Sequence, residues 1–335
     1  MAEVDKRLGI TPPISIALPT DQDTIANTAM VEELRRQNNF ESPSDTQKRC
    51  ASIRSRHLPP SWLLANLFFS FRSRHKVLAS LQQICDTFVK KVASEVEPGN
   101  DILLKDARGK IFTYGSFRLG VYGPGSDIDT LVVAPRYVTR EHYFKYFKDL
   151  LLSMAPKDAV TDLAVVTDAF VPIIKFEYWG ISIDLIFSRI ASMKQLPSGS
   201  DFDLKDNSLL RGLDDAELRS LNGTRVTDEI LDLVPEQTTF KMALRTIKLW
   251  AQRRAIYANI MGFPGGVAWA MMVARVCQVY PKACSATIVN KFFHVMLSWP
   301  WPQPVLLKHI EQTGPGNYRV WNPKVCDVGP PISIA

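Results

Sequence analysis

The chain has 335 residues, of which 46% are hydrophobic, so it is long enough to bury a large core and to form two domains. Its formal net charge of +6 and isoelectric point near 9 fit a polyanionic partner, although the excess is modest. The five cysteines form no C-x-x-C pair, and we find neither a secretory leader nor a run long enough to span a bilayer. These features argue against a secreted, disulfide-stapled or membrane protein and predict a reducing compartment.

The N-terminal part predicts an arm followed by a helix. Pro12, Pro13 and Pro19 mark a turn-rich arm, and a helix is expected around residues 24–37. The hexapeptide of residues 12–17 recurs at residues 330–335, a repeat for which we have no physical account.

The most specific pattern lies between Phe112 and Val133. Residues 111–114 predict a short strand, and Gly115-Ser116 should open a helical turn whose free backbone N–H groups can receive phosphate oxygens. Asp127 and Asp129 begin an apolar, β-branched strand. In a strand, residues i and i+2 share one face, so both carboxylates can hold the same divalent ions. This pattern is typical of metal-dependent nucleotidyl transfer.

Other phosphate or metal loops fit this segment less well. An EF-hand loop starting at Asp127 would need glutamate at its twelfth position, which is Val138. A Walker loop is excluded because no Gly-Lys-Ser/Thr follows a glycine-rich run. An ordinary turn remains the alternative, although the buried strand that follows disfavours it.

A third carboxylate comes from a predicted hairpin. After a helix capped by Thr139, residues 170–178 and 181–187 predict two strands that turn near Trp179-Gly180. Asp184 is a lone charge among apolar neighbours, and burying it unpaired would be costly. It therefore needs a cation or, as the alternative, a structural salt bridge with Lys175 or Arg189.

Helices are predicted to dominate from Asp228 onward. Residues 235–254 place Phe240, Leu244, Ile247 and Ala251 on one buried face. A cationic ridge on another side is expected to face outward, either as a binding surface or as an ordinary solvated face; it contains Lys241, Arg245 and Lys248. Gly265-Gly266 should start an apolar helix that continues to Tyr280.

Taken together, these motifs resemble the eukaryotic poly(A) polymerases of the polymerase-beta-like nucleotidyltransferase superfamily. The resemblance rests on segments spread over most of residues 77–325, namely residues 112–121, 127–131, 168–175, 221–227, 247–259, 262–270 and 301–304. It implies an α+β fold, in which a nucleotidyltransferase palm (a mixed sheet with flanking helices) precedes a mostly helical, incomplete central domain.

The resemblance also assigns individual residues. Asp127, Asp129 and Asp184 match the three catalytic, metal-binding carboxylates of the family. The residues matching its nucleotide-binding positions are Tyr114, Gly115, Ser116, Lys248, Tyr257, Asn259, Gly266 and Val267. Phe170 and Lys175 fall where the family holds the RNA 3′ end.

The implied activity is template-independent polyadenylation of mRNA. The RNA 3′-hydroxyl would attack the α-phosphate of ATP in line, while two ions activate the hydroxyl and neutralise the triphosphate and the leaving pyrophosphate. Mg²⁺ is the expected ion, with Mn²⁺ possible. The implied partners are ATP, the RNA 3′ end and cleavage and polyadenylation factors; the resemblance also implies a monomer in the nucleus, although the chain contains no run of five basic residues.

The chain departs from the family in length and in one segment. Residues 50–74 interrupt what should be one continuous helix, and Pro59-Pro60 must break any helix there. The expected organisation is an arm and helix (1–38), a palm with this insertion (39–221) and a truncated central domain (222–335), without the family's C-terminal RNA-binding domain.

Two alternatives remain open. The chain could be another terminal nucleotidyltransferase of the superfamily, since addition of uridylate, CCA or 2′-5′ linkages reuses the same metal site. It could also be a truncated, non-catalytic fragment that binds RNA or a cleavage factor.

Overall fold

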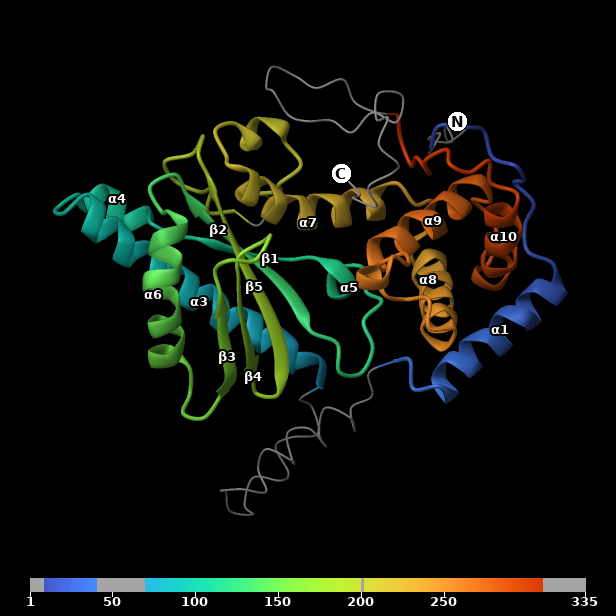
Figure 1. Ribbon diagram of the computed structural model, residues 1–335, viewed down its shortest axis with the longest axis horizontal. Helices are drawn as coiled ribbons and strands as arrows, with labels where there is room; N and C mark the ends of the chain where they lie inside the picture. Colours follow the sequence, from blue (N-terminus) through green and yellow to red (C-terminus); the bar gives the residue numbers. More distant parts are fainter. Residues whose placement is uncertain (1–8, 41–69, 200–201, 310–335) are drawn as a thin grey trace, which may run out of the picture. The chain divides into compact units, whose positions relative to one another are not determined.

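The computed structural model describes residues 9–40, 70–199 and 202–309, and within these residues it shows a mixed sheet and two sets of helices (Figure 1). The helices are α1 (Asp21–Arg36), α3 (Ser70–Val96), α4 (Asp101–Asp106), α5 (Gly115–Arg118), α6 (Arg140–Met154), α7 (Asp215–Asp232), α8 (Gln237–Arg253), α9 (Gly266–Val279) and α10 (Ser285–Leu297), with short 3-10 turns at Asn207–Leu210 and Asn259–Met261. The strands are β1 (Lys110–Thr113), β2 (Ile128–Pro135), β3 (Val160–Val166), β4 (Ile173–Tyr178) and β5 (Ile181–Ile190).

The described residues divide into two compact units. Residues 70–118, 122–199 and 202–226 form the sheet unit, and residues 9–40, 119–121 and 227–309 form the helical unit. The predicted α+β class, a mixed sheet with flanking helices followed by a helical region, is confirmed.

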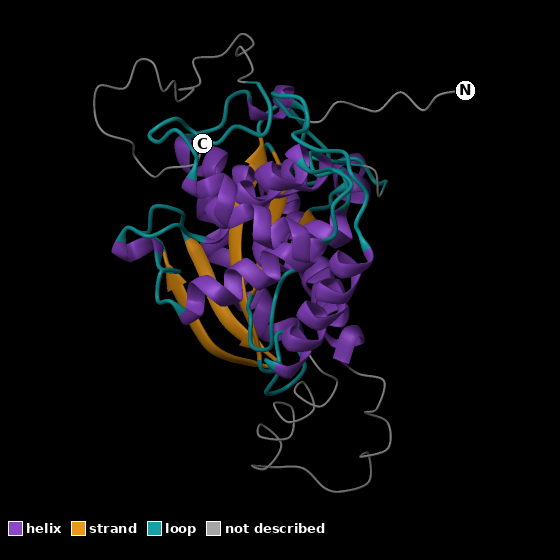
Figure 2. Ribbon diagram, turned by 90° about the vertical axis from the view of Figure 1, so that its right-hand side faces the viewer, coloured by secondary structure: helices purple, strands orange, loops and turns teal. Residues whose placement is uncertain are grey.

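One twisted sheet forms the frame of the sheet unit (Figure 2). Its strand order is β1-β2-β5-β4-β3. β2 and β5 run parallel, whereas the other neighbouring strands pair antiparallel. The predicted strand after Asp127 and the predicted hairpin that turns at Trp179-Gly180 are both confirmed, as β2 and as the pair β4–β5.

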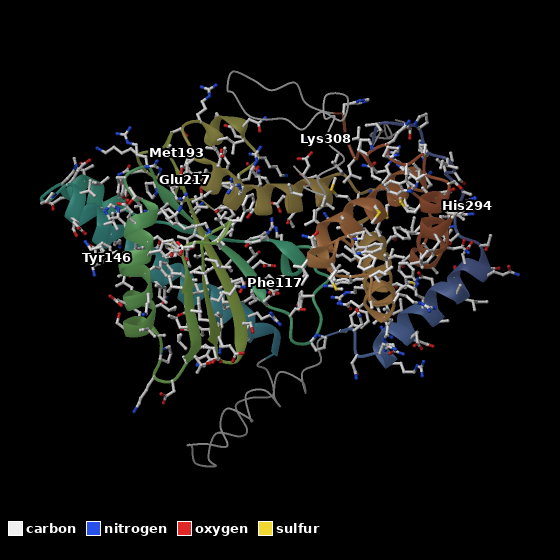
Figure 3. All side chains as sticks on the ribbon, viewed as in Figure 1. Phe117, Tyr146, Met193, Glu217, His294 and Lys308 are labelled. Atoms are coloured by element: carbon white, nitrogen blue, oxygen red, sulfur yellow. The ribbon has the colours of Figure 1, made fainter. Side chains whose placement is uncertain are left out.

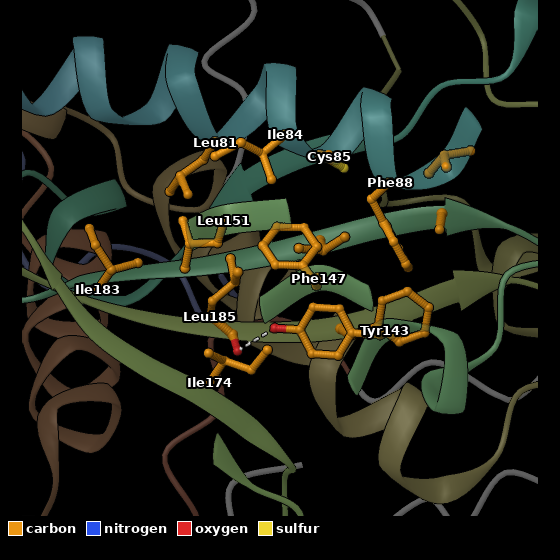
Figure 4. Close-up of a cluster of buried hydrophobic side chains, with 14 of the residues drawn as sticks. Leu81, Ile84, Cys85, Phe88, Tyr143, Phe147, Leu151, Ile174, Ile183 and Leu185 are labelled. Atoms are coloured by element: carbon orange, nitrogen blue, oxygen red, sulfur yellow. Dashed lines mark hydrogen bonds between the residues drawn. The ribbon is translucent and has the colours of Figure 1, made fainter. Parts of the chain in front are cut away.

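Helices α3 and α6 cover one face of this sheet. Alternate strand residues reach into the core on that side, where Ile183 and Leu185 of β5 belong to one cluster with Phe88 of α3 and Phe147 of α6 (Figure 4). The predicted cap of α6 is present, because the hydroxyl of Thr139 accepts a hydrogen bond from the His142 backbone N–H.

The opposite face of the sheet carries a second, smaller core. Leu131 and Val133 of β2 and Ile186 and Ile190 of β5 point into it, where they meet apolar residues of the chain that follows, up to Leu221. Because side chains alternate along a strand, Asp129 and Asp184 belong to this second face. The two acids therefore avoid the face that α3 and α6 seal from water.

In the helical unit, α8 shows the predicted buried face. Phe240, Leu244, Ile247 and Ala251 are all at most 2% exposed. Within the same unit, the predicted helix that begins at Gly265-Gly266 is α9, with Gly265 as its N-cap.

The prediction that Arg245 of α8 faces outward is wrong. This side chain is 6% exposed, and its guanidinium donates to the backbone oxygens of Asn39, at 2.8 Å, and Gly120, at 3.0 Å. It also lies 4.9 Å from the centre of the Phe40 ring. Two carbonyls and an aromatic face compensate the buried charge, so Arg245 stabilises the packing of this unit.

The N-terminal arm packs on α9, and α1 packs on α10. The backbone N–H groups of Ile14 and Ser15 both donate to the oxygen of Val279, and the hydroxyl of Thr287 donates to Asp23 in α1. The helix predicted at residues 24–37 is α1. The second copy of the hexapeptide, residues 330–335, lies outside the described residues.

Two further predictions concern the insertion and membrane-spanning helices. Of the predicted insertion at residues 50–74, the part up to residue 69 lies outside the described residues. The remainder belongs to α3, which begins at Ser70. In the part of the chain that the structure covers, no helix is both long enough and apolar enough to traverse a bilayer.

A single hydrogen bond tests the packing of α6 on β5. The Tyr143 hydroxyl is buried and donates to the Leu185 oxygen at 3.0 Å (Figure 4). Tyr143→Phe removes only this donor, and we expect it to lower the free energy of unfolding by about 1 kcal/mol, measured by urea denaturation. The control is Tyr146→Phe, whose hydroxyl bonds Glu95 at the surface and should matter less. Equal effects of the two variants would contradict this account.

Candidate metal and nucleotide site

Three carboxylates meet at the start of β2 and in the middle of β5. Asp129 is the register partner of Asp184 across the parallel pair, and Asp127 precedes Asp129 by two residues. One ligand oxygen from each of the three lies within 4.8 Å of the others. In the described part of the chain, this is the one group of acidic, histidine or cysteine side chains so arranged. The predicted convergence of Asp127, Asp129 and Asp184 is thus present in the fold.

Gly115 brings the backbone of the preceding turn against Asp129. A side chain at this position would place its Cβ 2.2 Å from Oδ2 of Asp129, and Gly115 has a φ of +64°, which other residues rarely adopt. The Tyr114 backbone N–H donates to the backbone carbonyl oxygen of Asp129 at 3.1 Å. The Gly-Ser turn, which continues as α5, therefore lies directly beside the carboxylates.

Tyr114 faces the acids as a neutral phenol. Burial raises its pKa, and the negative charges of Asp129, Asp184 and Asp127 raise it further. The ring packs against Gly223 of α7, where a Cβ would lie 3.0 Å from a ring carbon. Gly223 lies in the segment 221–227 that resembles the family, but the sequence alone did not predict its contact with Tyr114.

Asp184 has a second contact, with Lys175. The two residues are register partners on β4 and β5, and Lys175 Nζ lies 2.5 Å from Oδ2 of Asp184. The Asp184 side chain is 19% exposed and that of Lys175 is 50% exposed. The salt bridge posed as an alternative to metal binding is therefore present together with the carboxylate cluster.

Arg189, the other partner considered for Asp184, is engaged elsewhere. Its Nε lies 2.9 Å from a carboxylate oxygen of Glu217, which is almost fully buried on α7. Glu217 (labelled in Figure 3) also accepts from the backbone N–H of Asp214. This ion pair anchors the start of α7 and does not involve the acidic cluster.

Arg74 fixes the loop that leads into Asp127. Its side chain is 3% exposed, it donates to the Ser126 oxygen at 3.1 Å, and it lies 5.0 Å from the Tyr122 ring centre. Tyr122 in turn packs against Phe117, which is labelled in Figure 3. Arg74 falls in the predicted insertion, and its contact could not be predicted because no local pattern links an arginine to a carbonyl 52 residues away.

Phe170 is predicted to contact the RNA 3′ end. Its side chain is 77% exposed, and one face of its ring packs against Arg219. The Arg219 guanidinium lies 3.8 Å from the ring centre and donates to the Phe170 backbone oxygen at 2.9 Å. The charged group on one side leaves an aromatic surface of the kind on which nucleic-acid bases stack. Sequence reasoning did not identify Arg219.

The remaining predicted nucleotide residues belong to the helical unit and lie near one another. Lys248 Nζ is 5.7 Å from the Tyr257 ring centre. A Cβ on Gly266 would lie 2.8 Å from the Tyr257 hydroxyl, and one on Gly265 would lie 3.4 Å from the Asn259 side chain. Burial raises the Tyr257 pKa, so this hydroxyl also stays protonated at neutral pH.

The donor set of the acidic cluster suits a hard divalent cation. All three ligands are carboxylates, the ligands that Mg²⁺ and Mn²⁺ prefer over nitrogen or sulfur. Three such charges repel one another, and Lys175 forms its ion pair with Asp184. The residues present therefore fit a divalent metal.

A mixed sheet that carries such a cluster beside a Gly-Ser turn defines a metal-dependent nucleotidyltransferase palm. The family model described as the poly(A) polymerase nucleotidyltransferase domain matches residues 9–56 and 69–234. The model of the poly(A) polymerase central domain matches residues 239–329. The chain belongs to the poly(A) polymerase family.

Individual relatives agree with this placement. The chain is 54% identical over 320 residues to poly(A) polymerase pla1 of Schizosaccharomyces pombe and 50% identical over 317 residues to poly(A) polymerase PAPa of Candida albicans. These alignments cover 96% and 95% of the chain but 51% of each relative, so the chain spans about half the length of the curated relatives it matches.

Similarity to solved structures is more distant. The polymerase core of TRAMP, an RNA surveillance complex, is 17% identical with a TM-score of 0.39, over 75% of this chain and 64% of that one.

The contact of Gly115 with Asp129 can be tested with a matched glycine. Gly115→Ala places a methyl group against Oδ2 of Asp129 and also strains the backbone, so we expect Mn²⁺ affinity to fall at least tenfold. Gly99 has a φ of +81° and nothing within 4 Å of an added Cβ. Gly99→Ala should therefore cost only the backbone term, roughly 1–2 kcal/mol of stability, and leave metal binding intact. Wild-type Mn²⁺ affinity in Gly115→Ala would disprove the contact.

Proposed function

We propose that this chain is a polynucleotide adenylyltransferase that adds AMP from ATP to the 3′-hydroxyl of RNA and releases pyrophosphate. The observation that carries the proposal is the convergence of Asp127, Asp129 and Asp184, with their ligand oxygens within 4.8 Å, in a chain of the poly(A) polymerase family. The chain spans about half the length of its curated relatives, so the activity of the whole protein is part of this proposal.

In this proposal the three carboxylates hold divalent ions, with Mg²⁺ preferred and Mn²⁺ accepted. When bound, such ions lower the pKa of the attacking hydroxyl and neutralise the charge of the triphosphate. Asp129 and Asp184 are fixed by the pairing of β2 with β5, so the ligands need little rearrangement.

Each unit contains residues that we propose bind the nucleotide. In the sheet unit, the turn formed by Tyr114, Gly115 and Ser116 offers backbone N–H groups and a phenol to phosphate oxygens. In the helical unit, Lys248 and Tyr257 supply an ammonium and a hydroxyl for phosphate. Asn259, Gly266 and Val267 are proposed to contact the adenine and ribose.

The RNA is proposed to be held by Phe170 and Lys175. The open face of the Phe170 ring can stack on the terminal base, since its other face lies against Arg219. The bound 3′-hydroxyl then attacks the α-phosphorus, the bond to the bridging oxygen breaks, and pyrophosphate leaves.

Several further expectations belong to the same proposal. They are a nuclear location, a monomeric state, association with cleavage and polyadenylation factors, and a division into an arm (1–38), a palm (39–221) with an insertion at 50–74, and a central domain (222–335). The family membership supports the first three of them, and the break in the family match between residues 56 and 69 supports the insertion.

A primer-extension assay tests the proposed reaction. The purified full chain is incubated with an oligo(A) primer, Mg²⁺ and each of the four nucleoside triphosphates in turn. We expect extension with ATP and little with the others. Preferred incorporation of UTP would show a different terminal nucleotidyltransferase, and a folded chain that binds RNA but extends nothing would show a non-catalytic fragment.

Asp129→Ala is the matched test of the metal cluster. It removes the carboxylate that faces both Gly115 and Asp184, so AMP incorporation should fall by about a hundredfold or more. Asp149→Ala, an exposed acid on α6, should retain wild-type turnover. Near-normal incorporation by Asp129→Ala would refute the assignment.

A further inference from the structure

The ion pair between Lys175 and Asp184 concerns the metal site directly. Lys175 Nζ lies 2.5 Å from Oδ2 of Asp184, which is one of the three clustered carboxylates. A divalent ion of the Mg²⁺ type would sit about 2.1 Å from its carboxylate oxygens. An ammonium on the same carboxylate would then lie within a few ångströms of the ion, and like charges at such a distance repel.

The contact is also easy to break. The Lys175 side chain is 50% exposed, so the ammonium can return to water at little cost. Asp184, at 19% exposed, cannot do so, because the strand pairing on both sides of β5 fixes its backbone. The mobile partner in this pair is therefore the lysine.

We infer that Lys175 is a resident counter-ion of the metal site, which neutralises Asp184 until a divalent ion binds and displaces the ammonium. Lys175 is in this sense a positioning residue that acts through Asp184. The inference rests on the proposed function, because it requires Asp184 to be a metal ligand.

Displacement has two consequences for the site. Without metal, the lysine limits the repulsion among three neighbouring carboxylates and so stabilises the sheet at this point. With metal, the displaced ammonium can instead pair with an oxygen of the polynucleotide that reaches the site. Metal binding and occupation of the site by the polyanion should then favour each other.

Competition for Asp184 predicts the effect of removing the lysine charge. Lys175→Met should bind Mn²⁺ roughly fivefold more tightly than wild type, the scale expected for one partly exposed ion pair, as measured by electron paramagnetic resonance on the full chain. Lys175→Gln is a second neutral variant in case the methionine disturbs folding. Lys175→Arg keeps the charge and should restore the weaker, wild-type affinity.

A remote lysine controls for net charge. Lys148 is exposed on α6, and Lys148→Met removes the same charge from the sheet unit without touching the cluster. Its Mn²⁺ affinity should match that of wild type. If Lys175 had only a structural role, its neutral variants would change the stability of the chain but would not bind Mn²⁺ more tightly.

Thermal unfolding supplies a second readout. With EDTA present, Lys175→Met should melt below wild type, because the acids lose their compensating charge. On addition of Mg²⁺, the melting temperature should rise more for this variant than for wild type.

The outcomes separate this inference from the proposed function. If wild type binds Mn²⁺ and the neutral variants bind it no more tightly, the counter-ion role is wrong and the metal site stands. If wild type binds no Mn²⁺ at millimolar concentration, both proposals are overturned.

Discussion

The parallel register of β2 and β5 is the constraint on which the site depends. It sets Asp129 directly beside Asp184, on the sheet face that α3 and α6 do not cover. A slip of one residue in β5 would exchange Asp184 for Ile183 or Leu185 and would turn the acid into the helix-covered core. The apolar residues that alternate with Asp184 therefore fix the geometry of the ligands as well as the fold.

The charge balance of the cluster explains why a cation belongs there. Two like charges 4 Å apart repel by about 1 kcal/mol in water and by about 4 kcal/mol near a protein surface. An exposed ion pair such as Lys175–Asp184 contributes about 0–1 kcal/mol. This ion pair is therefore small beside the repulsion between neighbouring carboxylates, whereas a divalent ion brings two positive charges to the same place. The strand pairing holds the acids together at a cost in stability that metal binding recovers.

Local patterns in the sequence predicted the elements that hold the site. The spacing of Asp127 and Asp129, the alternation around Asp184 and the buried face of α8 all follow from the periods of strand and helix. The contacts that the sequence did not predict join residues that are distant in the chain. Arg245 was expected outside because a cation on a helix usually is, but its partners, Asn39 and Gly120, are distant in sequence. The contacts of Arg74 and Arg219 were missed for the same reason.

The proposed reaction requires Asp127, Asp129 and Asp184 together to hold divalent ions against a triphosphate. The most direct test is anomalous diffraction from a crystal of the chain soaked with Mn²⁺ and a non-hydrolysable ATP analogue. The account predicts anomalous peaks about 2.1 Å from oxygens of all three carboxylates, bridging to the triphosphate. Peaks elsewhere, with these three carboxylates free of metal, would contradict it.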